Sequence, residues 1–422
     1  MTLIKTSLLN AIAVSVKMLT LLGINKILAV YVGPAGYAAL GQFQNAMQMI
    51  TTLASGAINT GVTKYTAEYY DDEVRQRLVW RTAGTIALFG SITTALFISL
   101  FNQQLAIWLL KDVDYGSVFI WFAAALVLVT LNTLLLAILN GKKSVTRYVA
   151  ANIAGSLFGL IVTVIMAMNF GLYGALVALA IYQSLSFFVT LFLCFKTGWF
   201  KLNYIYGAID KATAFDLSKY AAMAFTSAAC VPISHMLLRD YVGDTLGWEA
   251  AGYWEAMWRL SAAYLMLVTT TLSVYYLPRL SELKDAAEIK HEIINGYRLI
   301  LPVAAVGGIV IYLLRDFIVG VLFTEEFEPM RDLFAWQMVG DTLKIGSWIL
   351  AYLMLSKAMV KLFIFTEIIF SVSFVLLSYS LIGALGLVGI AVAYTINYGA
   401  YWMLLSVLIF SRLRDNICCN DD

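Results

Sequence analysis

Seven ionisable side chains lie inside stretches of sequence that are apolar enough to cross a membrane. Near the centre of a membrane-spanning helix, each such group costs about 2.5–3.5 kcal/mol. Groups this costly are kept where they pair with one another, line a water-filled cavity or bind a charged ligand. The candidates for a substrate or ion pathway are therefore Lys17, Lys26, Glu255, Arg259, Asp341, Lys344 and Glu367.

Four of these residues form two pairs of opposite charge. Glu255 and Arg259 are four residues apart, and Asp341 and Lys344 are three apart. Each pair therefore shares one face of a helix, and Gln337 extends the face of the second pair. One interpretation is that both pairs neutralise themselves along a hydrated interior. The other is that Arg259 or Lys344 binds an anionic substrate, while Glu255 or Asp341 carries a proton in one state.

The remaining three charges occupy other spans. Lys17 lies near the middle of the first apolar run with no acid within four residues, which favours substrate contact over snorkelling. Lys26 lies nine residues further on, so the two lysines share a cavity only if the helix bends, for example at Gly23. Glu367 lies early in its run, where pairing with Lys361 at the interface is favoured over proton transfer.

Aromatic side chains repeat close to helical spacing beside Glu255 and Arg259. Trp254, Trp258 and Tyr264 belong to this set. Sugar rings stack well on aromatic faces, so these residues are candidates for glycan stacking. Ordinary packing between helices is the alternative explanation for each of them.

The composition indicates that membrane-spanning helices position these residues. The chain has 422 residues, of which 61% are hydrophobic and 13% charged, against about 25% charged in an average soluble domain. Lipid must therefore be its solvent, and continuous apolar runs indicate helices rather than barrel strands. A spanning helix needs about 20 apolar residues. We predict an all-α integral membrane protein with about twelve spans, near 7–31, 37–60, 82–101, 116–139, 148–168, 172–194, 216–238, 251–277, 294–317, 333–355, 362–381 and 385–410.

The distribution of lysine and arginine predicts the orientation of these spans. If the N-terminus is cytoplasmic, 20 of the 28 basic residues lie on cytoplasmic connections, four lie on the opposite side and four lie within spans. Positive charge accumulates on the cytoplasmic side of membrane proteins, so both termini are expected there. The four residues assigned to the opposite side are Lys111, Arg239, Arg315 and Arg331.

Internal similarity predicts a duplication. "GLYGALVALAIY" (171–182) matches "GLVGIAVAYTIN" (386–397) at an offset of 215 residues, and the same offset places Lys142 on Lys357. Six helices per repeat give both units the same orientation.

We therefore expect two parallel six-helix lobes around a central cavity that opens alternately to either side. The expected lobes are residues 1–200 and 201–422, with a linker near 196–216.

Signatures of enzymes are missing from the sequence. It contains no GxxxxGK[ST] loop, no cluster with metal-ligand spacing and no Ser/His/Asp constellation. We expect a transporter rather than an enzyme, with no cofactor, no metal and no nucleic-acid partner. Energy would then come from an ion gradient or from the gradient of the substrate.

Several segments resemble a known family. "YWEAMWRLSAAYLMLVTTTLSVYYLPRLSELKD" (253–285) is similar to the eighth span and following loop of bacterial O-antigen flippases of the Wzx type. "MRDLFAWQMVGDTLKIGSWILAYLMLSKA" (330–358) resembles the tenth span, and is most similar to flippases for lipid III of enterobacterial common antigen. Residues 7–43 and 56–72 fit as well, so the resemblance covers essentially the whole chain.

The resemblance implies a transporter of the multidrug/oligosaccharidyl-lipid/polysaccharide exporter superfamily. The implied substrate is an oligosaccharide on undecaprenyl pyrophosphate, flipped from the cytoplasmic to the periplasmic leaflet of the bacterial inner membrane. The polymerase and chain-length regulator of the same pathway are implied partners. Lys17, Lys26, Arg259 and Lys344 would bind the pyrophosphate, and Glu255, Asp341 and Glu367 are the candidates for ion or proton coupling.

Two departures from the family pattern qualify these roles. Ala262 and Ala263 follow Ser261 where family members often carry an acid, and Gln44 lies near a position where some lipid III flippases have arginine. A multidrug antiporter of the same superfamily is the main alternative, but four intramembrane cations against three acids favour an anionic ligand. A polysaccharide polymerase or ligase is a weaker alternative, because the outside connections are short.

Overall fold

The computed structural model describes residues 3–357 and 359–414, without the side chains of residues 3–11, 13, 219, 220, 274 and 278. The described chain is helical and contains no strand. Contacts between residues divide it into two compact units. Unit 1 holds residues through Val32 and Ala39–Pro232, and unit 2 holds Gly33–Ala38 and residues from Ile233 onward.

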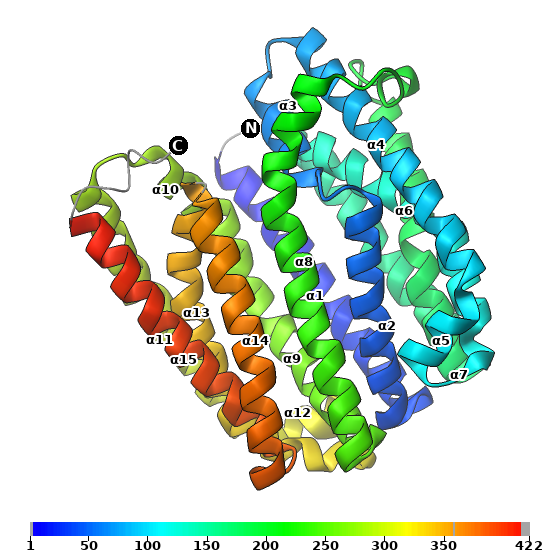
Figure 1. Ribbon diagram of the computed structural model, residues 1–422, viewed down its shortest axis with the longest axis vertical. Helices are drawn as coiled ribbons and strands as arrows, with labels where there is room; N and C mark the ends of the chain where they lie inside the picture. The colour runs from blue at the N-terminus through cyan, green and yellow to red at the C-terminus, as the bar shows by residue number, and fades with distance from the viewer. Residues whose placement is uncertain (1–2, 358, 415–422) are drawn as a thin grey trace. The chain divides into compact units, whose positions relative to one another are not determined.

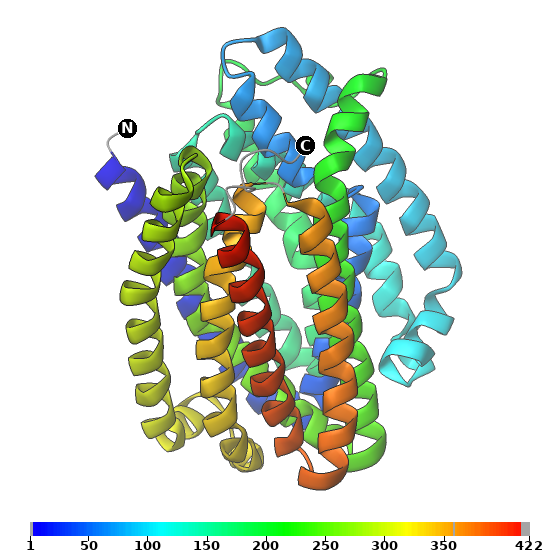
Figure 2. The same cartoon turned by 60° about the vertical axis from the view of Figure 1, so that its left-hand side comes forward.

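Unit 1 is built around six long helical segments. In Figures 1 and 2 these run from blue to green. The elements are α1 (Leu3–Tyr31), α2 (Gly33–Ala54), α3 (Asn59–Glu68), α4 (Glu73–Leu100), α5 (Asn102–Leu110), η1 (Val113–Tyr115), α6 (Gly116–Gly141), α7 (Val145–Phe195), η2 (Leu202–Tyr204) and the first part of α8 (Lys211–Leu246). α7 packs on both α1 and α6.

Unit 2 also has six long helices, because α8 passes from unit 1 to unit 2 at Pro232. α13 contacts α11 and α15, and α14 lies beside α15, as the orange and red ribbons of Figure 2 show. The elements after α8 are α9 (Trp248–Thr271), the π-helix η3 (Leu272–Tyr276), α10 (Leu277–Glu282), α11 (Ala286–Leu313), α12 (Arg315–Leu322), η4 (Glu325–Leu333), α13 (Phe334–Ser356), α14 (Val360–Leu385) and α15 (Val388–Arg414).

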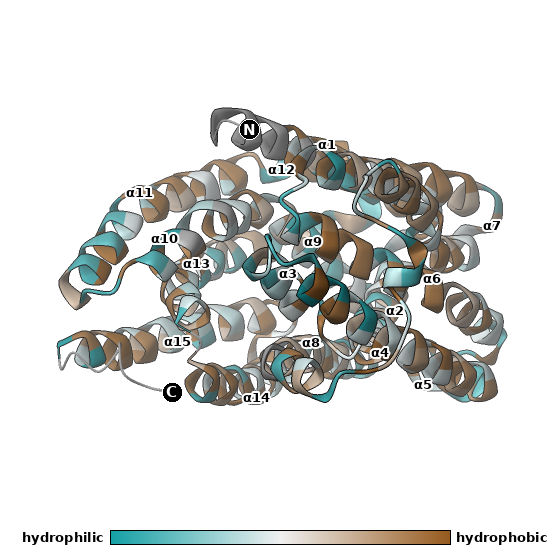
Figure 3. Ribbon diagram, turned by 90° about the horizontal axis from the view of Figure 1, so that it is seen from above, coloured by the Kyte–Doolittle hydropathy of each residue, from teal (hydrophilic) through white to brown (hydrophobic). Residues whose placement is uncertain are grey.

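The prediction of twelve spans is confirmed within the described residues. Nine stretches have the length and apolar composition to cross a membrane. One of them, α7, consists of two helices that meet at Gly171, and α2 and α9 have 22 and 24 residues. These last two fall outside the nine because their sequences carry more polar side chains. In Figure 3, α1 and α7 are mostly brown, the colour of hydrophobic residues.

The predicted duplication reappears in the backbone. Gly171 and Gly386, 215 residues apart, both have a positive φ, of 55° and 60°. Each begins the last helix of its repeat, and a left-handed conformation suits glycine best. A Cβ on Gly174 would lie 2.0 Å from the carbonyl oxygen of Met166, and a Cβ on Gly389 would lie 2.3 Å from that of Leu381. These partners are again 215 residues apart, so both units use the same close helix contact.

The matched lysines also have similar roles. Lys142 Nζ donates a hydrogen bond of 2.7 Å to Gln76 Oε1, and its ammonium lies 5.5 Å from the centre of the Trp199 ring. Burial lowers the pKa of Lys142. Lys357 Nζ donates to the carbonyl oxygen of Leu283. Each lysine follows the fourth long helix of its unit. Lys142 joins that connection to the first turn of α4, and Lys357 joins it to Leu283, between α10 and α11. The division at residue 200 stays a prediction.

Candidate functional site

A buried cluster of three charges lies where α8 and α9 meet in unit 2. Glu255 is 4% exposed, and both of its carboxylate oxygens accept hydrogen bonds. Arg239 Nη2 of α8 donates to Oε2 at 2.6 Å, and Arg259 Nε of α9 donates to Oε1 at 2.7 Å. The carboxylate of Glu255 therefore bridges two guanidinium groups. The predicted pair of Glu255 and Arg259 is confirmed, and Arg239 joins it.

Asp341 of α13 is fully buried and accepts hydrogen bonds from three helices. An ionised carboxylate only accepts hydrogen bonds, so a site with four donors suits the charged form. Tyr264 and Tyr394 donate at 2.6 and 2.7 Å, Ser261 at 2.5 Å, and Gln337 Nε2 at 3.3 Å. The predicted position of Gln337 on the same helix face as Asp341 agrees with this contact.

Lys344 lies one turn further along α13 inside a cage of aromatic rings. Its Nζ lies 4.5 Å from the ring centre of Trp258, and 5.0–5.4 Å from those of three further rings, Trp348, Tyr394 and Tyr398. The face of an aromatic ring attracts a cation, by about 0.5–2 kcal/mol for a desolvated group. The side chain is 7% exposed.

The ion pair expected between Asp341 and Lys344 is not formed. Both residues are fully described, and no carboxylate oxygen lies within 4.0 Å of the Lys344 ammonium among the described residues. The physical reason is that each charge has its own environment. Hydroxyl and amide donors surround the carboxylate, whereas the π faces surround the ammonium.

The aromatic candidates are part of the same interior. Trp254 is 2% exposed, and its ring lies 5.3 Å from the ring of His235. Trp258 meets His235 edge-on at 4.2 Å and also covers Lys344. Tyr264 donates its hydroxyl to Asp341. Each ring therefore has a packing or hydrogen-bonding role in unit 2, beside any contact with a glycan.

The three remaining candidates are less enclosed. Lys17 of α1 is exposed in unit 1, and its contact with a substrate stays a prediction. Lys26, on the same uninterrupted helix, is half-buried. Glu367 of α14 is half-buried in unit 2, and Lys361 is exposed. Within the described part of the chain, no group of three or more His, Cys, Asp or Glu side chains could hold a metal ion.

Sequence reasoning missed several members of these clusters. Arg239 was counted with the outer connections, but α8 continues to Leu246 and buries Arg239 to 1% exposure. The signal was available, because Glu255 has two oxygens and only one partner on its own helix. Tyr394 lies 53 residues from Asp341 in the chain, and nothing in a single sequence pairs those two positions.

The twelve long helices of the described residues define a multi-pass membrane protein. The fold is similar to a solved structure described as the inward-facing conformation of a multidrug resistance MATE family transporter of the MOP superfamily. The TM-score is 0.77, with 15% sequence identity over 96% of each chain. At this identity the likeness concerns the fold alone.

Sequence comparisons identify the family. The family model "Polysaccharide biosynthesis protein" matches residues 3–284. Two proteins named Lipid III flippase, from Escherichia coli (strain K12) and Shigella flexneri, are each 32% identical over 404 residues, which is 96% of this chain and 97% of theirs. The chain belongs to the polysaccharide biosynthesis protein family, and the resemblance found in its sequence is confirmed.

Proposed function

We propose that this protein flips an oligosaccharide linked to undecaprenyl pyrophosphate across the bacterial inner membrane, from the cytoplasmic to the periplasmic leaflet. The observation that carries the proposal is 32% identity, over nearly the full length of both chains, to proteins named Lipid III flippase. The similarity in fold to a transporter supports movement of a substrate rather than its chemical conversion.

The charges of unit 2 support an anionic substrate. Arg239 and Arg259 both donate to the carboxylate of Glu255, which gathers two guanidinium groups in one cluster of unit 2. Lys344 contacts rings rather than a carboxylate, so its ammonium can turn to a phosphate without breaking an ion pair. Guanidinium and ammonium groups are the usual ligands of phosphate oxygens. We assign pyrophosphate binding to Arg259 and Lys344 in unit 2, and to Lys17 and Lys26 in unit 1.

Asp341 is the proposed coupling residue. Protonation would add a donor to a carboxyl group that already faces four donors, and at least one of its hydrogen bonds would have to reverse direction or break. Such a change loosens the contacts that join α9, α13 and α15. Glu255 and Glu367 are further coupling candidates, and Trp258 and Tyr264 keep enough exposure for contact with a glycan.

The proposed function also suggests an orientation in the membrane and two protein partners. The excess of basic residues on alternate connections supports cytoplasmic termini. A glycan delivered to the periplasmic leaflet is the substrate of chain assembly, so the polymerase and the chain-length regulator are the proposed partners. Attachment of a reporter enzyme at each terminus tests the orientation.

Reconstitution in lipid vesicles tests the function. The probe is fluorescent undecaprenyl-pyrophosphate-linked oligosaccharide, and the readout is its loss of access to an external quencher. We expect faster movement in vesicles with the protein than in empty vesicles, and a dependence on the imposed proton gradient. Equal rates in both kinds of vesicle, under proton and sodium gradients, would reject the proposal. Efflux of a cationic dye in the same vesicles would instead favour the multidrug antiporter.

A further inference from the structure

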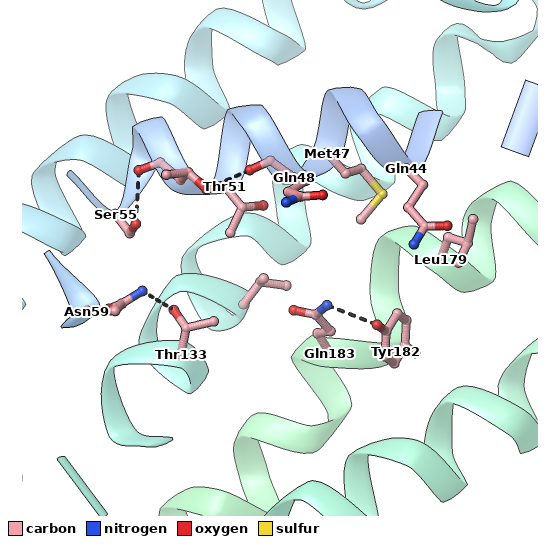
Figure 4. A pocket seen from close by; sticks show the side chains of 12 residues that line it. Gln44, Met47, Gln48, Thr51, Ser55, Asn59, Thr133, Leu179, Tyr182 and Gln183 are labelled. Carbon is pink, nitrogen blue, oxygen red and sulfur yellow. Dashed lines mark hydrogen bonds between the residues drawn. The ribbon is translucent and has the colours of Figure 1, made fainter. Parts of the chain in front are cut away.

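Unit 1 contains a polar cavity that the charged clusters do not use. It has a volume of about 320 Å³, and Figure 4 shows the side chains of α2, α3, α6 and α7 that surround it. Small-molecule sites typically occupy about 300–1,000 Å³. The lining residues are Gln44, Met47, Gln48, Thr51, Thr52, Ser55, Asn59, Val129, Thr133, Leu179, Tyr182 and Gln183.

The lining is polar but uncharged. Nine of the twelve residues carry an amide or a hydroxyl group, and none carries a carboxylate, ammonium or guanidinium group. Without a charge the cavity suits neither a pyrophosphate nor a cationic drug. Amides and hydroxyls both donate and accept hydrogen bonds, as the hydroxyl groups of a sugar do.

Part of the lining is held in place by internal hydrogen bonds. Asn59 Nδ2 donates to Thr133 Oγ1 at 3.4 Å, and Thr133 donates to the carbonyl oxygen of Thr130 at 2.8 Å. Gln183 Nε2 donates to Tyr182 Oη at 3.0 Å, which fixes the amide beside the tyrosine ring. These contacts preorganise the wall that α6 and α7 provide.

Other polar groups of the cavity have hydrogen-bonding capacity to spare. Gln48 and Thr51 lie one turn apart on α2, and their side chains make no hydrogen bond within the described part of the protein. The carbonyl oxygen of the Gln183 side chain also has none there. Figure 4 shows Gln48 and Gln183 facing one another across the space between α2 and α7. Two amides on opposite walls can form hydrogen bonds with a ligand that has hydroxyl groups on both edges.

We propose that this cavity binds a neutral sugar residue of the transported lipid-linked oligosaccharide. The inference rests on the proposed function and adds to it a glycan subsite in unit 1, formed by residues other than those assigned to the pyrophosphate. Gln48, Thr51 and Gln183 make the sugar contacts, and Tyr182 supplies an apolar ring beside them.

Binding to the protein in lipid nanodiscs tests the subsite. Two probes are compared, undecaprenyl-pyrophosphate-linked oligosaccharide and undecaprenyl pyrophosphate without sugar. The test variant is Gln48→Leu with Gln183→Leu, which removes both amides at similar volume. The matched control is Gln104→Leu, an exposed glutamine of α5 outside the cavity.

We expect the wild-type protein and Gln104→Leu to bind the glycosylated lipid more tightly than the bare lipid. The double variant should lose about tenfold of its affinity for the glycosylated lipid, because two neutral hydrogen-bonding groups are gone. Its affinity for the bare lipid should stay unchanged.

Four results would overturn the subsite. In the first, the double variant keeps its preference for the glycosylated lipid. In the second, it loses affinity for both lipids equally, which would show that the two glutamines have only a structural role. Wild-type protein that flips the lipid in vesicles without preferring the glycosylated form would also overturn the subsite, while leaving the proposed function intact. Wild-type protein that neither binds nor flips either lipid would overturn both.

Discussion

Replacing Glu255 with glutamine removes the carboxylate that Arg239 and Arg259 share. The variant keeps the size of the side chain and leaves two guanidinium groups facing a neutral amide. Because Arg239 is 1% exposed and the Arg259 side chain 13%, water cannot restore the lost interaction. The folded protein is therefore expected to lose stability.

The size of the loss follows from the geometry. The ion pairs have lengths of 2.6 and 2.7 Å and are almost completely enclosed. Unit charges about 4 Å apart interact by about 4 kcal/mol at an effective dielectric constant of roughly 20. Removing one partner from a buried pair costs about 3–5 kcal/mol in measured cases. We expect Glu255→Gln to lower the free energy of unfolding by about 3–5 kcal/mol.

Unfolding in mixed micelles, with an increasing fraction of dodecyl sulfate, measures this free energy. Glu249→Gln is the matched control, because Glu249 is exposed on the same helix, and it should change stability by less than about 0.5 kcal/mol. Replacing all three charged residues with leucine or methionine should recover most of the loss, since no buried charge is then left alone. A Glu255→Gln protein as stable as the control would refute the reasoning.

Two further predictions concern transport and packing. Lys344→Met should abolish flipping in vesicles at unchanged stability, because methionine fills the aromatic cage without a charge. Lys361→Met, at an exposed position, is the control and should flip normally. Equal rates in the two variants would contradict the assignment of Lys344 to pyrophosphate binding. Gly174→Ala and Gly389→Ala should each cost about 1–3 kcal/mol in the same unfolding assay, because the added methyl group meets a carbonyl oxygen. Gly307→Ala, which has open space around it, is the control, and an equal effect would disprove the close contact.

Much of the fold could be predicted from the sequence. Continuous apolar runs determine helices in lipid, because the backbone has no other partner there. The matched segments at 171 and 386 predicted a duplication, and the structure gives their first glycines similar positive φ values. The end of α8 was predicted too early, because Arg239 suggested an outer connection and the helix continues for another seven residues. Charge marks the water interface only when the side chain has no buried partner.

The candidate site was less predictable. Spacing along a helix shows which residues share a face, and it correctly paired Glu255 with Arg259. The same spacing paired Asp341 with Lys344, but contacts from other helices separate those two charges. Residues on α9 and α15 decide that outcome, and a single sequence does not state which helices meet. The neutral cavity of unit 1 could not be predicted for a related reason. Glutamine and threonine are common residues, and a single sequence does not show which of them line the same cavity.

The aromatic cage also gives the protein an optical reporter. Indole emission responds to a nearby charge, and Trp258 and Trp348 have ring centres 4.5 and 5.0 Å from the Lys344 ammonium. An anion that draws the ammonium away would change the emission of these two indoles. Comparison with Trp258→Phe isolates the signal of Trp258 from that of the other tryptophans. The emission of unlabelled protein then reports in real time whether an anion occupies the cage.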